Sequence, residues 1–348
     1  MAVDFHWHAR DEEQSVQDTV AHSLAVAGAC GLDAIAAMPN TKRPLTTLER
    51  CREYLSLAPN DSGVGFFVHI GVTADVEQVK RAVDATRKDS RIIGMKMYWD
   101  HSTGNLGITR EDDQFRVMET LAKEGYKGVL VCHLENPQFN NDALYNPKEP
   151  SSWNRKCRPE ISEISSLMLA ERFASAVGFL GTIHVAHVST REAVDMIWAY
   201  TGAVRLSCGV TPHHAFLDDS YLDGPNGAHH KCNPPLRVKE TQEGLLERLL
   251  DGRIPIIESD HAPHTEEAKR GDRPPSGIAS GTAWPFVRDE LRRRGMVEER
   301  LFEVTHMNAC NLYGIDVWPS GRGPDYEKLR VLEGDYAFDA FRHLKPNV

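Results

Sequence analysis

Two histidines stand near the start of the chain, within the run DFHWHAR at residues 4–10. The run is apolar enough for a short buried strand, and alternate side chains of a strand point to the same side. His6 and His8 are therefore expected to converge, and two converging imidazoles can bind a borderline metal such as Zn²⁺. The competing interpretation is an ordinary pair of histidines near a terminus, so further ligands at other strand ends must decide.

Polar residues of ligand type occur in several later apolar runs. Lys96 lies inside the run 92–98, where an unpaired ammonium would be costly. Either a buried carboxylate pairs with it, or CO₂ has converted it to a carbamate that can bridge two metals. His133 and His187 end two further runs, and Asp260 follows the last one. An aspartate in that place can bind a metal through one oxygen and take a proton from metal-bound water with the other.

Together these positions form a set of candidate metal ligands at the ends of five predicted strands. The set is His6, His8, Lys96, His133, His187 and Asp260. Shared between two metals, with a modified lysine and a hydroxide as bridges, it would fill a binuclear site. His184 is three residues before His187, so it is expected on the other face of its strand as a core histidine. The pairs His213–His214 and His229–His230 are assigned no role.

The elements that must position these side chains alternate along the chain. Eight apolar runs of strand length lie at 3–8, 33–38, 65–73, 92–98, 128–134, 181–188, 204–210 and 254–259. Helix-like segments separate or follow them, at 15–29, 46–57, 76–87, 110–123, 159–176, 189–200, 238–250 and 282–294. This alternation is typical of an α/β fold whose parallel strands close into a (β/α)₈ barrel of the TIM type, with the active site at the carboxyl ends of the strands. An open, doubly wound sheet is the structural alternative.

A single domain over residues 1–348 is expected, because no linker divides the chain. Residues 298–348 are expected to add a C-terminal helix and then a strap of loops with one short strand. The polar stretches 137–152 and 218–235 are interpreted as long loops after strands. A content of 41% hydrophobic residues is sufficient for one large core.

Composition argues against several classes of function. A net charge of −10 without a basic block argues against nucleic acid and anionic membranes as partners. No apolar run approaches a membrane span, and the early first strand leaves no room for a signal peptide. Seven cysteines without a C-x-x-C pair predict reduced thiols and a cytoplasmic protein. The expected partner is a small-molecule substrate.

Seven motifs, in family order, resemble the dihydroorotases of the amidohydrolase superfamily. They are HWHARD at 6–11, MPNT at 38–41, MKMY at 95–98, HVST at 187–190, TPHH at 211–214, NPPLR at 233–237 and SDHAPH at 259–264. The resemblance implies a metal-dependent hydrolase barrel in which the six candidate ligands hold two divalent ions. Zn²⁺ is the metal expected first, and Lys96 is expected to be carbamylated. It also implies substrate binding by Arg10, Asn40, Asn233 and His264. A homodimer is common among similar enzymes.

Two departures from the family pattern affect which subclass of dihydroorotases, the longer or the shorter, the chain resembles. Longer members carry a β-sandwich built from both termini, whereas here the first strand begins at residue 3. A barrel without this sandwich is therefore expected, as in the short dihydroorotases, although HVST, TPHH and NPPLR are more typical of the longer class. The run HLEN at 133–136 also differs from the common His-Ala/Cys-Glu-Asp.

The resemblance implies a reaction, the reversible hydrolysis of L-dihydroorotate to N-carbamoyl-L-aspartate in pyrimidine biosynthesis. A metal-bridging hydroxide would attack the ring carbonyl, and Asp260 would carry its proton to the leaving nitrogen. Arg10 would hold the substrate carboxylate through two parallel hydrogen bonds. Asn40 and His264 would complete that clamp, and Asn233 would contact the ring amide. The alternatives are purely structural roles: a surface salt bridge from Arg10 to Asp11 or Glu12, and a helix-cap or turn role for Asn40.

Two other functions stay open. Hydantoinases, dihydropyrimidinases and allantoinases would share the metal ligands, but their neutral rings would not need the guanidinium of Arg10. A non-catalytic barrel that scaffolds an aspartate transcarbamoylase would be expected to lose ligands, and none of the six is missing here.

Overall fold

The structure, a computed structural model, describes residues 2–342, 344 and 345; residue 343 and residues 346–348, which belong to the predicted strap, lie outside this range. Eight parallel strands pair in chain order, from β1 to β8. They are β1 Val3–Trp7, β2 Ala34–Ala37, β3 Gly65–Gly71, β4 Ile92–Tyr98, β5 Val129–His133, β6 Thr182–Val185, β7 Arg205–Val210 and β8 Ile256–Ile257. The order confirms the predicted barrel and rules out a doubly wound sheet, in which the strand order reverses part-way.

The barrel closes between β8 and β1. Trp7 and His261 form a parallel bridge, and the His8 N–H donates to the His261 carbonyl at 2.8 Å. Lower on the same seam, the buried Asp4 carboxylate accepts the Ser259 N–H at 3.1 Å. The seam places the end of the first strand beside the end of the last one, and so joins residues such as Asp4 and Ser259, which are 255 positions apart in sequence.

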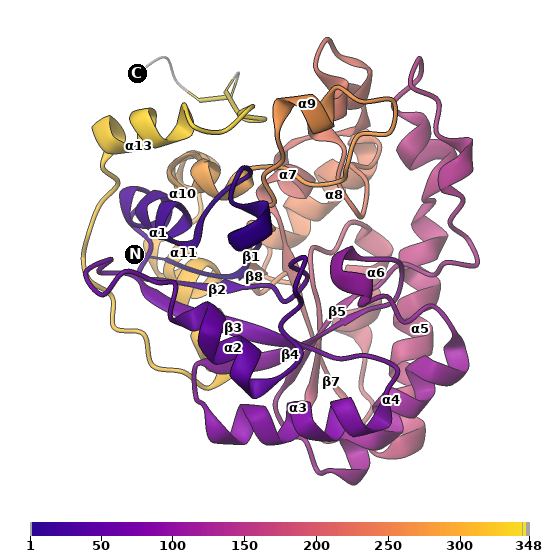
Figure 1. The fold of residues 1–348 in the computed structure, drawn as a ribbon. Coiled ribbons are helices and arrows are strands. Elements are labelled where there is room, and N and C mark those ends of the chain that lie inside the picture. The colour runs from indigo at the N-terminus through magenta and orange to yellow at the C-terminus, as the bar shows by residue number, and fades with distance from the viewer. Residues whose placement is uncertain (1, 343, 346–348) are drawn as a thin grey trace.

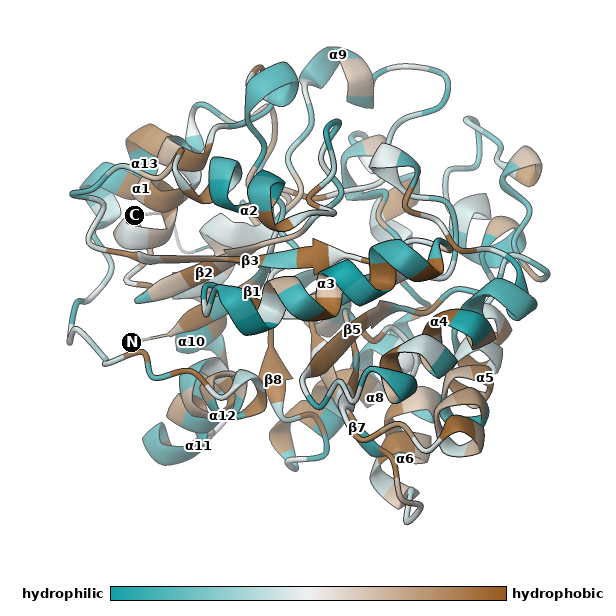
Figure 2. Ribbon diagram, turned by 60° about the horizontal axis from the view of Figure 1, so that its bottom comes forward, coloured by the Kyte–Doolittle hydropathy of each residue, from teal (hydrophilic) through white to brown (hydrophobic). Residues whose placement is uncertain are grey.

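Helices follow the strands and cover the barrel from outside (Figure 1). They are α1 Val20–Ala29, α2 Leu48–Leu55, α3 Val76–Lys88, α4 Glu111–Lys123, α5 Glu160–Val177, α6 Arg191–Ala199, α7 Pro212–Phe216, α8 Lys239–Leu250, α9 Glu266–Lys269 and α10 Trp284–Arg293. Figure 2 shows hydrophobic residues along the strands, whereas α3 carries many hydrophilic residues on the side turned to the viewer. Strands covered on both faces are expected to be apolar on both.

Side-chain caps decide where three helices begin. Thr47 Oγ1 accepts the Arg50 N–H at 3.1 Å, and Thr190 Oγ1 accepts an N–H in the first turn of α6 at 3.4 Å. Helices α2 and α6 therefore begin at residues 48 and 191, two residues after the starts of the predicted segments 46–57 and 189–200, and both are shorter than predicted. Thr19 caps α1, which likewise begins later than predicted.

The C-terminal segment differs from its prediction in one respect. The predicted helix is present as α11 (Glu298–Phe302), a π-helical turn and α12 (Asn308–Tyr313). Beyond it, α13 (Tyr326–Glu333) replaces the loops and short strand that the Pro- and Gly-rich sequence predicts, and it packs beside α1 (Figure 1). Asp325 begins this helix by accepting the Lys328 N–H at 3.0 Å, so a local N-cap decides the outcome.

The seven cysteines are all buried free thiols. Burial raises the pKa of Cys30 and of Cys51 to about 12, so both behave as small apolar core residues. In the part of the chain that the structure describes, no helix has both the length and the apolar composition to cross a bilayer.

Candidate active site

One cavity of about 360 Å³ is lined by all the residues that the sequence analysis selected. It contains the candidate ligands His6, His8, Lys96, His133, His187 and Asp260, together with Arg10, Asn40, Asn233 and His264. These residues come from the carboxyl ends of strands and from the loops that follow, which is where barrels of this type place their active sites.

The first group of ligand atoms lies at the seam between β1 and β8. His8 Nε2 lies 2.9 Å from Asp260 Oδ1, and His6 Nε2 lies 3.3 Å from the same oxygen. Burial alone would raise the pKa of Asp260, but hydrogen bonding and charge from both imidazoles outweigh it and hold this pKa well below its usual range. Two ring nitrogens and one carboxylate oxygen lie within 4.8 Å of one another, a donor set that suits a borderline divalent metal.

The second group lies at the ends of β5 and β6. His133 Nδ1 lies 3.1 Å from His187 Nε2. The two groups adjoin, because the His187 and His6 ring centroids are 5.1 Å apart. His187 has left-handed backbone with φ of 42°, which takes its side chain out of the alternation of the strand before it.

The prediction for His184 is confirmed in one part and wrong in the other. It is a buried core histidine, with Nε2 3.3 Å from Glu258 Oε2. Its expected place on the face opposite His187 is wrong, because the same Glu258 carboxylate also accepts the His187 N–H. The parity argument fails because β6 ends at Val185, so alternation does not continue as far as His187.

Lys96 lines the same cavity as both groups. The side chain is fully buried, and its Nζ makes no hydrogen bond or ion pair with the described residues. The Lys96 ammonium lies 5.1 Å from the centroid of the Tyr98 ring. Burial lowers the pKa of Lys96 to about 8. The direct ion pair with a buried carboxylate, one of the two predictions for Lys96, is therefore wrong for the described chain.

These observations test whether the residues fit a metal centre. Two groups of imidazole and carboxylate donors adjoin, and a buried amine without a partner lies beside them. Unpaired buried donors and acceptors of this kind are costly unless a ligand satisfies them. The donor set fits divalent metal ions.

Two buried carboxylates that the sequence analysis missed contact the ligands from behind. Glu258 Oε2 lies 3.4 Å from His6 Nδ1, and Glu135 Oε2 lies 2.9 Å from His133 Nε2. Burial opposes ionisation of Glu135, but the guanidinium of Arg158, 2.8 Å away, and His133 lower its pKa to about 2. Glu258 precedes Asp260 by two residues and Glu135 follows His133 by two, but β8 ends at Ile257 and β5 ends at His133, so the available signal was closeness in sequence to a predicted ligand and not strand alternation.

Arg10 is buried, 4% exposed, and no hydrogen bond or ion pair joins it to the residues described. The predicted alternative partners are engaged elsewhere. Glu12 pairs with Arg50, and Asp11 caps the turn that follows it. The surface salt bridge is therefore wrong, and the guanidinium faces the cavity as a site for an anion.

Two amides line the same cavity with part of their hydrogen-bonding capacity free. Asn40 caps no described helix. Its Nδ2 donates to Ser102 Oγ at 3.2 Å, and its buried Oδ1 has no partner in the described chain. Asn233 Oδ1 accepts from Trp153 Nε1 and from Ser276 Oγ, each at 3.0 Å. Its Nδ2 group is then the part of Asn233 left to donate to a ligand.

The loop after α9 forms one wall of the cavity and is held by two buried lysines. The ammonium groups of Lys231 and Lys269 donate to the carbonyls of Pro274 and Pro275, at 2.7 and 3.0 Å. His264 Nε2 donates to a third carbonyl of this loop at 3.1 Å, so only Nδ1 of His264 is left for a ligand. Sequence patterns did not point to either lysine.

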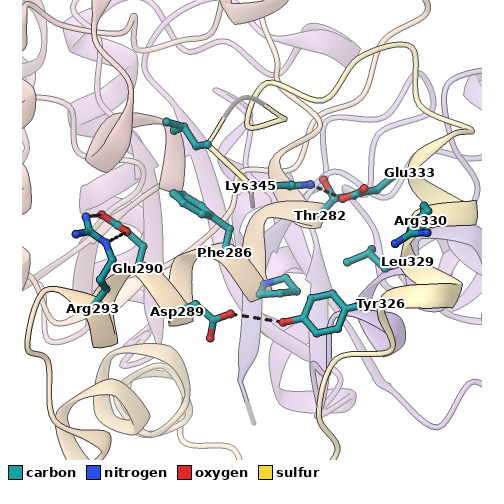
Figure 3. Close-up of a pocket in the computed structure, with 12 residues that line it drawn as sticks. Thr282, Phe286, Asp289, Glu290, Arg293, Tyr326, Leu329, Arg330, Glu333 and Lys345 are labelled. Atoms are coloured by element: carbon teal, nitrogen blue, oxygen red, sulfur yellow. Dashed lines mark hydrogen bonds and ion pairs between the residues drawn. The ribbon is translucent and has the colours of Figure 1, made fainter. Parts of the chain in front are cut away.

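A second hollow, of about 540 Å³, lies between α10 and α13 (Figure 3). Its lining contains no histidine, and it includes two ion pairs. Arg293 pairs with Glu290 at 2.7 Å, and Lys345 pairs with Glu333. The residues able to do chemistry therefore gather in the barrel cavity and not here.

Fold and site together define a (β/α)₈ hydrolase with a metal-binding donor set at its carboxyl end. The dihydroorotase of Halobacterium salinarum is 31% identical over 319 residues, which are 90% of this chain and 71% of that protein. The dihydroorotase of Methanosarcina mazei is 28% identical and is matched by 92% of this chain over 71% of its own length. No protein-family model matches the chain. The chain belongs to the dihydroorotase family of cyclic amidohydrolases, a family of enzymes.

Solved structures show the same barrel at lower identity. The L-hydantoinase of Arthrobacter aurescens superposes with a TM-score of 0.79 at 22% identity, covering 92% of this chain and 73% of that one. The dihydroorotase of Saccharomyces cerevisiae in complex with 5-fluoroorotic acid superposes with a TM-score of 0.70 at 19% identity, covering 91% and 84%. These likenesses establish the fold.

Proposed function

We propose that this enzyme catalyses the reversible hydrolysis of L-dihydroorotate to N-carbamoyl-L-aspartate, a step of pyrimidine biosynthesis. The observation that carries the proposal is Arg10, a buried guanidinium with no partner in the described chain that lines the same cavity as the candidate ligands. The exocyclic carboxylate of dihydroorotate would pair with it through two hydrogen bonds. The neutral rings of hydantoin or dihydrouracil would leave it buried and unpaired, which is costly.

The proposal assigns the metal ligands by group. His6, His8 and Asp260 would hold one divalent ion, His133 and His187 would hold a second, and a carbamate on Lys96 would serve both. When bound, two ions such as Zn²⁺ would polarise the ring carbonyl and acidify water. Support for the carbamate comes from the buried, partnerless Nζ of Lys96 and its pKa of about 8, since the neutral amine is the form that adds to CO₂.

Asp260 would move the proton in this scheme. Its low pKa keeps the carboxylate ionised at neutral pH, so it can accept the proton of the attacking water and pass it to the leaving ring nitrogen. In the reverse direction the same carboxylate would take the proton from the ureido nitrogen. Its Oδ1 lies 3.3 Å from His6 Nε2 and 2.9 Å from His8 Nε2, the nitrogens that would share a metal ion with it.

Loop residues would orient the ring. Asn233 Nδ2 would donate to a ring carbonyl, because its Oδ1 is already occupied by Trp153 and Ser276. Asn40 and His264 would complete the carboxylate clamp beside Arg10. The proposal includes a cytoplasmic location, which the seven buried free thiols support. A homodimer stays a prediction.

The test is hydrolysis of L-dihydroorotate by Zn²⁺-loaded protein, with dihydrouracil and hydantoin assayed in parallel. Turnover of dihydroorotate alone is expected. Turnover of the neutral rings instead would keep the metal site but assign another cyclic amidase activity. No turnover of any of the three, with fewer than two metals bound per chain, would favour the scaffold function.

A further inference from the structure

Glu258 lies inside the barrel, two residues before Asp260, and is 4% exposed. Its two oxygens face different strands. Oε2 lies 3.4 Å from His6 Nδ1 and 3.3 Å from His184 Nε2. Oε1 accepts the backbone N–H of His187 at 2.6 Å. One carboxylate thus contacts two of the candidate ligands, from β1 and from the turn after β6.

We propose that Glu258 is a positioning residue that orients His6 and His187 for metal binding. For His6 the argument concerns the tautomer. Nδ1 makes no hydrogen bond with the described residues, but the Glu258 carboxylate 3.4 Å away favours a proton on this nitrogen, and that tautomer leaves the Nε2 lone pair free for a cation. Nε2 is the atom that lies 3.3 Å from Asp260 Oδ1, on the other side of the ring. The inference depends on the proposed function only for the assignment of the two histidines as ligands.

For His187 the argument concerns the backbone. A φ of 42° is disfavoured for any residue other than glycine. This backbone is what brings the His187 ring to 3.1 Å from His133 Nδ1. The hydrogen bond from the His187 N–H to Glu258 holds the turn in place, so the carboxylate supports the second group of ligands as well as the first.

The surroundings leave room for this carboxylate. A Cβ atom at Gly209, on β7, would lie 2.6 Å from the carboxyl carbon of Glu258. On the remaining side, His184 contacts Glu258 through Nε2 and Ser207 Oγ through Nδ1, at 3.3 Å in both cases. His6 on β1, His184 on β6 and Gly209 on β7 therefore surround this one carboxylate.

The chain offers a matched control. Glu163 is equally buried, 1% exposed, but its carboxylate accepts only from the backbone and hydroxyl groups of Ser189 and Thr190. It contacts none of the candidate ligands. Replacing Glu163 by glutamine should affect folding alone, whereas the same replacement at Glu258 also places an amide donor against either His6 Nδ1 or the His187 N–H.

The experiment measures Zn²⁺ affinity by competition with a chromophoric chelator, using the full chain. Glu258→Gln is expected to weaken Zn²⁺ binding about 10–100-fold, with KM for L-dihydroorotate unchanged in the Zn²⁺-saturated enzyme. Glu163→Gln is expected to bind Zn²⁺ as the unmodified protein does. Gly209→Ala, which retains the carboxylate but displaces it, should weaken Zn²⁺ binding in the same direction. Circular dichroism verifies that each variant is folded.

Unchanged Zn²⁺ affinity in folded Glu258→Gln would overturn the inference, and so would equal losses in Glu258→Gln and Glu163→Gln. If Gly209→Ala fails to fold, Glu258→Asp supplies the second comparison, because it keeps the charge and should restore part of the affinity. Metal affinity is read without substrate. Failure of the proposed function, seen as no turnover of dihydroorotate, is therefore distinguishable from failure of this inference.

Discussion

The floor and the rim of the cavity are built in different ways. The floor is the set of candidate ligands, His6, His8, Lys96, His133, His187 and Asp260, none more than 8% exposed. The rim is the set Arg10, Asn40, Asn233 and His264, which lie on loops, with Asn233 and His264 only half-buried. Strands and buried carboxylates hold the floor, whereas loop-to-loop hydrogen bonds such as the one from Ser276 to Asn233 hold the rim.

This difference separates two kinds of effect. In the proposed function, floor residues would act on metal binding and on the proton, so their loss should lower kcat. Rim residues would contact parts of the substrate that do not react, so their loss should raise KM or change substrate preference. The comparison fails if rim variants abolish turnover or if floor variants change KM alone.

The largest effect is expected for Asp260→Asn on the floor. The amide cannot accept the proton, so kcat for L-dihydroorotate should fall about 10³-fold, while circular dichroism shows an intact barrel. Steady-state kinetics at saturating substrate make the measurement. Activity within tenfold of the unmodified enzyme would remove Asp260 from the role of base.

Arg10→Ala should have the next largest effect, and it tests the rim. Loss of two charge-assisted hydrogen bonds should raise KM for L-dihydroorotate about 10–100-fold. Any turnover of dihydrouracil should change little, because that ring lacks the carboxylate. Arg10→Lys, the control, should recover only part of the loss, since an ammonium cannot form the paired geometry. Equal losses on both substrates would contradict the clamp.

Lys231→Met should have a smaller effect, because Lys231 supports the rim from behind. Its ammonium donates to Pro274 O and lies 3.7 Å from the Trp153 ring centroid. Methionine keeps the apolar stem but not the donor, so KM should rise about 3–10-fold with metal content unchanged. Lys42→Met is the control, since the Lys42 side chain is 65% exposed. Loss of bound metal in Lys231→Met would contradict the division of roles between floor and rim, because a residue that supports the rim should not affect metal binding.

The smallest effect is expected at Asp18, which lies in the segment between β1 and α1. Asp18 Oδ2 accepts from Tyr336 at 3.0 Å and lies 3.5 Å from His261 Nε2, next to Asp260. Burial opposes ionisation of Asp18, but hydrogen bonds from His22 and His261 lower its pKa below the usual value. A lowered folded-state pKa contributes stability above about pH 4, and this is lost as pH falls further.

Asp18→Asn should therefore lower the free energy of unfolding by about 1–3 kcal/mol at pH 6, and the difference should shrink below about pH 4. Urea unfolding at pH 6, 4.5 and 3.5 makes the measurement. A difference that stays constant over this range would show that the charge of Asp18 does not stabilise the fold.

Local sequence was sufficient for the strands and for the membership of the floor. Fully buried parallel strands are apolar on both faces, so each run was visible by itself. Once eight such runs alternate with helices, the polar residues at their ends must meet at one end of a barrel. Helices α2 and α6 begin two residues later than predicted, because Thr47 and Thr190, each the second of two adjacent hydroxyl residues, act as the caps.

Local sequence could not predict the contacts that orient the side chains of the floor. Whether Nδ1 or Nε2 of an imidazole faces the cavity depends on what touches the other nitrogen. For His6 that group is Glu258, from the opposite end of the chain. His184 was assigned to the wrong face because the backbone of His187 leaves the strand geometry on which alternation depends.

Residue types at strand ends thus determine which chemistry this protein is equipped for, because strand periodicity and barrel closure are properties of the chain itself. Packing between distant segments decided whether each of these groups has a hydrogen-bonding or ion-pair partner. Arg10 is available to an anion because Glu12 is held by Arg50, and Lys96 is poised as an amine because no described carboxylate reaches its Nζ. Burial and partner choice depend on neighbours from other strands and loops, and only the closed barrel brings those neighbours together.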